Sequence, residues 1–263
     1  MRYTISNDGT KIAYDQIGSG PAVILVCGGS TDRTANSSLA GLLSQELTVF
    51  NYDRRGRGDS GDQPEYAVGR EIEDISAVIS AAGGSANLFG TSSGAALALE
   101  AAASGLQVTR LALWEPPYIL AGTRPTLPAD QPEIYRSLVA AGRRGDAVEF
   151  FMTQVVGLPQ EFAAQARQAP WWAATEALAH TLAYDATILG DYSIPDGRLG
   201  QVSMPVLVLV GGATWDWLHA STKALAERLP YGRHQTLPDQ THDVAPDVLA
   251  PALVEFFKNG LSL

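Results

Sequence analysis

Ser92 stands at the centre of a G-x-S-x-G pattern that runs from Gly90 to Gly94. Residues 86–89 before it have the composition of a short strand, and residues 95–102 after it are rich in helix formers. A sharp turn from strand to helix directs a serine hydroxyl outward, and the flanking glycines remove Cβ atoms that would clash there. The free N–H groups at the start of the helix favour negative charge beside that hydroxyl. The pattern therefore predicts a nucleophilic serine.

Strand-like and helix-like segments alternate around this turn. Continuous apolar runs such as Ala22–Val26 are typical of strands that are covered on both faces, as in a parallel sheet. We expect strands at 3–6 and 11–16 (a hairpin turning at 7–9), 22–27, 48–52, 86–89, 108–114, 206–210 and 234–237. We expect helices at 39–47, 68–82, 93–103, 218–228 and 249–258.

The alternation stops between residues 116 and 200. This block is helix-like, contains eight prolines and is rich in bulky side chains. The sequence therefore predicts an α/β fold, a doubly wound, mostly parallel sheet built from residues 1–115 and 201–263, with 116–200 as an inserted helical cap. We expect some of the aromatic residues to pack the cap and others to line a pocket above Ser92. These bulky residues are Tyr118, Tyr135, Phe150, Phe151, Met152, Phe162, Trp171, Trp172, Tyr184 and Tyr192.

Composition restricts the possible partners and compartment. The 263 residues carry a net charge of −10, which argues against nucleic acid and anionic membranes as partners. Cys27 is the single cysteine, so there is no intrachain disulfide and no cysteine metal cluster. The longest strongly apolar run, residues 22–27, is far too short to span a bilayer, and we expect a cytoplasmic protein. The oligomeric state is left open.

Four segments in order give the chain a resemblance to the α/β-hydrolase fold superfamily, in its serine-nucleophile, esterase-like form. They are CGGS at 27–30, where the family usually has His-Gly-x, NYDRRGRGDS at 51–60, GTSSG at 90–94, and QTHD at 240–243. The resemblance covers essentially the whole chain. It implies that Ser92 is the nucleophile and that His242, in the loop after the last strand, is the base. It also implies an oxyanion hole formed by the backbone N–H groups of Gly29 and Ser93.

The acid that orients His242 has two candidates. Most members carry an aspartate a few residues past the penultimate strand, but here Thr214 stands at that position, and Asp216 lies two residues later. Some haloalkane dehalogenases of this fold instead use a glutamate directly after the strand that follows the nucleophile helix, and Glu115 occupies the matching point. We favour Glu115 and keep Asp216 as the alternative.

The remaining charged and glycine-rich motifs predict no cofactor. The charged side chains of segment 51–60 are expected to order a tight turn rather than to catalyse. Gly28 and Gly29 lack the spacing of a dinucleotide-binding loop, and no His, Asp or Glu grouping has metal-ligand spacing. We expect Cys27 to be a buried, unreactive side chain.

The resulting hypothesis is a serine hydrolase that cleaves a carboxylic ester or thioester of an apolar small molecule through an acyl-enzyme. Cofactor-free perhydrolysis or carbon–carbon bond hydrolysis on the same triad is an alternative, since one fold hosts many reactions. An alternative of another class is a non-catalytic ligand-binding or biosynthetic accessory protein that retains the pocket. Dehalogenation and epoxide opening need an aspartate where Ser92 stands.

Overall fold

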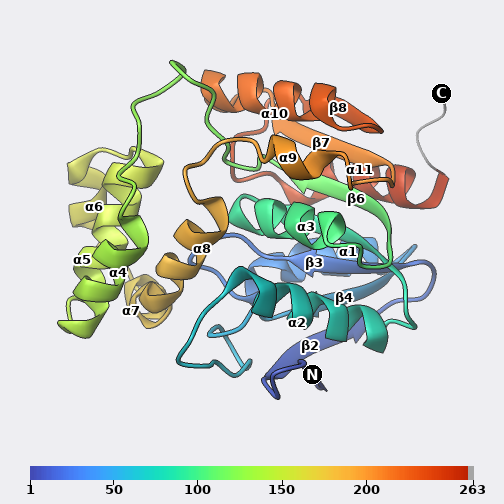
Figure 1. The fold of residues 1–263 in the computed structure, drawn as a ribbon, viewed down its shortest axis with the longest axis horizontal. Helices are drawn as coiled ribbons and strands as arrows, with labels where there is room; N and C mark the ends of the chain where they lie inside the picture. The colour runs from blue at the N-terminus through green and yellow to red at the C-terminus, as the bar shows by residue number, and fades with distance from the viewer. Residues whose placement is uncertain (260–263) are drawn as a thin grey trace.

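An eight-stranded sheet forms the centre of the computed structural model, which describes residues 1–259 (Figure 1). The strand order is β1-β2-β4-β3-β5-β6-β7-β8, and all neighbours from β4 to β8 run parallel. The strands are β1 (Arg2–Ile5), β2 (Lys11–Ile17), β3 (Ala22–Val26), β4 (Thr48–Tyr52), β5 (Ala86–Thr91), β6 (Val108–Trp114), β7 (Val206–Gly211) and β8 (Gly232–Leu237). The sequence-based prediction of a doubly wound, mostly parallel sheet is confirmed.

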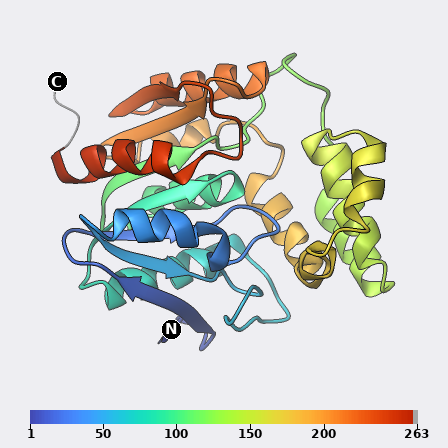
Figure 2. The same ribbon diagram turned by 180° about the vertical axis from the view of Figure 1, so that it is seen from behind.

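Helices cover both faces of this sheet, as the two opposite views show (Figures 1 and 2). One layer contains α2 (Val68–Ala81), α3 (Ser93–Ala103) and α10 (Asp216–Arg228), and the other contains α1 (Ser37–Leu43) and α11 (Pro246–Asn259). Side chains alternate between the layers along each strand: Ile24 packs with the first and Leu25 with the second. This is why the central strands appear in the sequence as unbroken apolar runs.

The N-terminal hairpin differs from the rest of the sheet because both of its pairings are antiparallel. Strand β1 pairs with β2, and β2 pairs with β4. Gly9 closes the turn between β1 and β2 with a φ of +84°, a conformation that side chains disfavour. The predicted hairpin is therefore confirmed.

Most predicted elements agree with the structure within one or two residues, and α1 is an exception. The sequence predicts a helix over 39–47, but α1 begins at Ser37 and ends at Leu43. Beyond that point the chain tightens, because Gln45 and Glu46 donate to carbonyls three residues back. Among residues 1–259, none of the helices has both the length and the apolarity that a membrane crossing requires.

Between β6 and β7 the chain is irregular over residues 115–130, where the sequence predicts a helix-like block, and is mostly helical from Gln131 to Leu199. The segments are α4 (Gln131–Ala140), α5 (Arg144–Phe150), η2 (Phe151–Val156), α6 (Gln160–Ala166), α7 (Trp172–Ala177), η3 (Ala179–Thr181), α8 (Leu182–Leu189) and α9 (Asp196–Leu199). We refer to α4–α8 as the cap helices. They share a hydrophobic cluster that includes Tyr135, Val148 and Trp172. Helix α8 contacts α4 on one side and α2 and α3 of the sheet layer on the other, so it joins the cap helices to the sheet (Figure 1). The division of the chain at residues 116 and 200 stays a prediction.

Candidate active site

Ser92 occupies a strained turn between β5 and α3. Its φ of +55° and ψ of −124° lie outside the usual regions for a side-chain-bearing residue. A Cβ at Gly90 would stand 2.6 Å from Cα of Ala95, and one at Gly94 would overlap the carbonyl of Cys27. Both positions therefore require glycine, and the turn is held tightly between α3 and the loop after β3.

His242 and Glu115 meet beside this turn. Nδ1 of the His242 ring lies 2.5 Å from Oε2 of Glu115, whose carboxylate is fully buried. Oε1 of Glu115 also accepts a hydrogen bond of 2.8 Å from the backbone N–H of Gly211. The indole N–H of Trp114 donates to the backbone carbonyl of His242 at 2.9 Å and so fixes the loop that carries the ring. Together these contacts hold the His242 imidazole in a single orientation.

Thr214, which stands where most members place the acid, is a hydrogen-bond donor to Glu115. Its hydroxyl lies 3.2 Å from Oε2 of that carboxylate. Asp216 is exposed at the first residue of α10, and within residues 1–259 no contact joins it to His242. The structure therefore brings Glu115, and not Asp216, to the imidazole.

The loop after β3 lies against the start of α3. A Cβ at Gly29 would stand 3.6 Å from the hydroxyl of Ser93, so the two residues implied as oxyanion-hole donors are close neighbours. The Ser93 N–H is in the first turn of α3 and has no intrahelical acceptor. Within the described residues, the Gly29 N–H likewise donates to no backbone carbonyl. Both donors remain available to a bound oxygen.

Asp185 of α8 reaches from the cap helices to this loop. It is 4% exposed, and its Oδ1 accepts hydrogen bonds from Ser93 Oγ and Arg54 Nη1 at 2.8 Å and from Arg57 Nη2 at 2.9 Å. Its Oδ2 would lie 3.2 Å from a Cβ at Gly29, so that position has little room for a side chain. Asp185 thus contacts the loop and the nucleophile turn together.

The two arginines extend the same network into the loop after β3. Arg57 donates to the carbonyls of Gly28 and Thr31, and Arg54 donates to the carbonyl of Cys27 at 3.3 Å. Asp53 accepts backbone hydrogen bonds and orders its turn, as the sequence suggested for this motif. Sequence reasoning did not foresee that the neighbouring arginines hold the loop that carries Gly29.

Burial and neighbouring charges shift the pKa values of two groups at this site, Asp185 and Cys27. Burial alone would raise the pKa of Asp185, but the positive charges of Arg57 and Arg54 outweigh it and lower that pKa. Burial raises the pKa of the Cys27 thiol, which donates weakly to the carbonyl of Thr31 at 3.5 Å. Asp185 is therefore a carboxylate, and Cys27 is a neutral, buried side chain.

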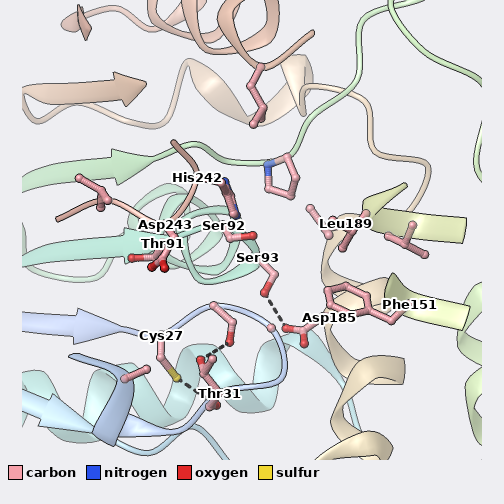
Figure 3. Close-up of a pocket in the computed structure, with 18 of the residues that line it drawn as sticks. Cys27, Thr31, Thr91, Ser92, Ser93, Phe151, Asp185, Leu189, His242 and Asp243 are labelled. Carbon is pink, nitrogen blue, oxygen red and sulfur yellow. Dashed lines mark hydrogen bonds between the residues drawn. The ribbon is translucent and has the colours of Figure 1, made fainter. Parts of the chain in front are cut away.

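A cavity of about 380 Å³ opens above the serine. Ser92 and His242 lie together on one side of it, and Phe151 and Leu189 of the cap helices lie on another (Figure 3). Figure 3 also shows Ser93 pointing at Asp185, which lines the same cavity. The lining is mainly apolar, which suits an organic molecule of modest size.

The aromatic residues divide between cap packing and cavity lining. Tyr135, Phe151 and Tyr192 line the cavity. Trp171 and Trp172 do not belong to its lining, since Trp172 packs inside the cap cluster and Trp171 is exposed. Two tryptophans outside the predicted cap, Trp215 and Trp217, also line it.

Two lining residues, Asp185 and Arg124, were not singled out from the sequence. A signal for Asp185 exists in the helical spacing. Leu182, Asp185, Ala186 and Leu189 follow the i, i+3, i+4, i+7 pattern of one helix face, and all four line the cavity. A single acid on an otherwise apolar helix face indicates a buried partner.

Comparison with known proteins agrees with the fold. The profile of the alpha/beta hydrolase family matches residues 23–253. The crystal structure of an alpha/beta hydrolase from Sphaerobacter thermophilus is similar over 98% of this chain and 100% of that chain, with 52% identity and a TM-score of 0.93. A thermophilic esterase from Thermogutta terrifontis superposes over 99% of each chain, with 23% identity and a TM-score of 0.75.

A curated relative gives a local match. The uncharacterized hydrolase YraK of Bacillus subtilis is 36% identical over 101 residues, which span 37% of this chain and 37% of YraK. The family profile, by contrast, covers most of the chain, including the nucleophile turn and the histidine loop. On this evidence the chain is an enzyme of the alpha/beta hydrolase family.

Proposed function

We propose that this enzyme hydrolyses a carboxylic ester or thioester through an acyl-enzyme formed on Ser92. The observation that carries the proposal is the contact of 2.5 Å between His242 Nδ1 and the buried carboxylate of Glu115. A buried carboxylate at Nδ1 holds a proton there and leaves Nε2 as the basic nitrogen. Ser92 lines the same cavity as His242, within the turn that exposes its hydroxyl.

The reaction follows from these positions. His242 Nε2 accepts the proton of Ser92 as Oγ attacks the substrate carbonyl, and Glu115 stabilises the imidazolium that forms. The N–H groups of Gly29 and Ser93 donate to the developing oxyanion. The imidazolium then protonates the leaving alcohol or thiol. A water molecule, deprotonated by the same imidazole, then attacks the acyl carbon, and the imidazolium returns that proton to Ser92 Oγ as the acid leaves.

The experiment is active-site labelling with a fluorophosphonate, read by intact mass. We expect one adduct on the wild-type protein and none on Ser92→Ala, with ester hydrolysis in that variant reduced at least about a thousandfold. Ser80→Ala, an exposed serine of α2, is the matched control and should label like the wild type.

Two outcomes would contradict the proposal. A folded wild-type protein that neither labels nor hydrolyses any ester would support the non-catalytic ligand-binding alternative. Labelling of the Ser92→Ala variant would place the nucleophile on another residue.

A further inference from the structure

The cavity wall holds one arginine that lacks a carboxylate partner. Arg124 lies in the segment between β6 and α4 and lines the cavity above Ser92. Within residues 1–259 no acidic side chain forms an ion pair with it. Asp185, a buried acid of the same wall, is already neutralised by Arg54 and Arg57. Asp243 is exposed in the loop beside His242.

Two contacts fix the Arg124 guanidinium against the wall. Its Nη2 donates to the backbone carbonyl of Val155 at 2.8 Å, and its Cζ lies 4.8 Å from the ring centroid of Trp217. Val155 and Trp217 line the cavity as well. A guanidinium has five N–H donors, and the contact to Val155 uses only one of its nitrogens. The Nε and Nη1 donors have no acceptor among the described side chains and carbonyls.

The absence of a nearby carboxylate has an energetic consequence. Burial lowers the pKa of Arg124, because the charge is partly removed from water without an acid to compensate it. Arg54, buried completely but paired with Glu71 and Asp185, has its pKa raised instead. An anion arriving at Arg124 would supply the missing partner, and a carboxylate fits a guanidinium through two parallel hydrogen bonds.

The same wall connects Arg124 with the reacting groups. The Trp217 ring stacks on Trp215 with centroids 6.2 Å apart, and the Trp215 ring lies 6.0 Å from the His242 ring. The guanidinium and the imidazole therefore stand at opposite ends of a pair of indoles. A ligand that reaches both must place several apolar atoms between its anion and its scissile bond.

We propose that Arg124 binds a carboxylate at the far end of the substrate, so that the preferred substrates are small esters carrying a carboxylate separated from the scissile bond by an apolar spacer. This proposal rests on the ester hydrolysis proposed above. Arg124 contributes to substrate specificity, and it takes no part in the covalent steps at Ser92.

The test compares matched esters that differ only in the terminal carboxylate. The p-nitrophenyl half-esters of adipate and suberate are measured against p-nitrophenyl hexanoate and octanoate. We expect kcat/KM to be at least about tenfold higher for the anionic member of each pair, the size of one charge-assisted contact. Arg124→Met should abolish this preference, mainly through KM, and Arg124→Lys should restore part of it.

Arg136→Met is the matched control for net charge. Arg136 is an exposed arginine of α4 that pairs with Glu133 and does not line the cavity, so the preference should survive its removal. Equal kcat/KM values for the paired esters in the wild type would overturn the proposal. A preference that persists in Arg124→Met would also overturn it.

A binding measurement separates this proposal from the proposed hydrolysis. Calorimetric titration of Ser92→Ala with the adipate half-ester and with the hexanoate ester needs no turnover. Tighter binding of the adipate half-ester, lost when Arg124→Met is added, supports the carboxylate site even if the wild type cleaves no ester. Hydrolysis of both esters with equal binding would leave the proposed function standing and refute the carboxylate site.

Discussion

Ser93, the residue after the candidate nucleophile, donates a hydrogen bond of 2.8 Å from its hydroxyl to Oδ1 of Asp185 in helix α8. The contact joins the first turn of α3, which covers the sheet, to α8, which is one of the cap helices. Asp185 also neutralises Arg54 and Arg57, which hold the loop after β3. One carboxylate therefore connects the cap helices with the two backbone N–H groups of the proposed oxyanion hole.

The first prediction concerns this carboxylate. Asp185→Asn leaves two buried guanidinium groups without their shared acceptor charge, and removing one partner of a buried pair costs about 3–5 kcal/mol. We expect a lower free energy of unfolding in urea and a lower kcat for ester hydrolysis. Asp196→Asn is the control, because Asp196 pairs with Arg228 on the surface and should change stability by less than about 1 kcal/mol. Equal unfolding midpoints for Asp185→Asn and the wild type would contradict the prediction.

The second prediction assigns the acid. Glu115→Gln should lower kcat strongly, because only the residue at Nδ1 fixes the imidazole tautomer, and loss of a triad acid costs on the order of 10⁴ in rate. Asp216→Asn is the matched variant and should retain most of the activity, since Asp216 does not contact His242 in the described residues. Steady-state kinetics with one chromogenic ester measure kcat for both variants. A larger loss of kcat in Asp216→Asn than in Glu115→Gln would assign the role to Asp216.

The third prediction concerns acid stability. Burial alone would raise the pKa of Asp8, but hydrogen bonds from Thr10 and Arg55 outweigh it and lower that pKa to about 2. Since the folded value lies below the unfolded value near 4, the unfolded state binds more protons between these two pH values. The stabilisation by Asp8 is therefore complete above about pH 4 and is lost as the pH falls towards 2.

Urea unfolding between pH 2 and pH 7 measures this contribution. At neutral pH the free energy of unfolding should be higher for the wild type than for Asp8→Asn. This difference should disappear as the pH approaches 2. Asp130→Asn, which removes an exposed carboxylate outside the Arg55 network, should show no such trend. A difference that stays constant down to pH 2 would argue against a lowered pKa.

The fourth prediction concerns acyl length in neutral esters. The cavity lining is mainly apolar, so each added methylene should improve kcat/KM by up to about 0.8 kcal/mol until the 380 Å³ cavity is full. A series from p-nitrophenyl acetate to octanoate should rise to an optimum, and Phe151→Ala should move that optimum to longer chains. Trp171→Ala, outside the lining, should leave the profile unchanged. A flat or steadily falling wild-type profile would mean that the acyl group does not occupy the apolar part of the cavity.

Much of the fold could be predicted from local pattern. The unbroken apolar run of Ala22–Val26 indicates a doubly covered strand because alternate side chains enter two different cores. The turn at Ser92 was predictable for a similar reason, since Gly90 and Gly94 are required by backbone contacts within a few residues of chain or in the adjacent loop. The pattern that predicts this turn is therefore confined to five consecutive residues, although Gly94 is also required by its contact with Cys27.

The contacts that were missed are long-range. Asp185 accepts a hydrogen bond from Arg57 across 128 residues, and Arg124, in the segment after β6, contacts Trp217 in the first turn of α10. The helical spacing around Asp185 indicates a buried acid but does not identify its arginine partners, and no periodic pattern marks Arg124. The acid at Glu115 was reached through resemblance to other family members rather than through any local pattern.

The position of Asp185 also limits how α8 can be exchanged for a foreign segment. The carboxylate lies on α8, whereas the groups that it binds lie in the segment after β4 and in the turn of Ser92. A chimaera that received a foreign segment in place of α8 would leave Arg54 with Glu71 alone and would remove the carboxylate that pairs with Arg57. An exchange of α8 in this chain therefore has to include the two arginines and Gly29 as one structural unit.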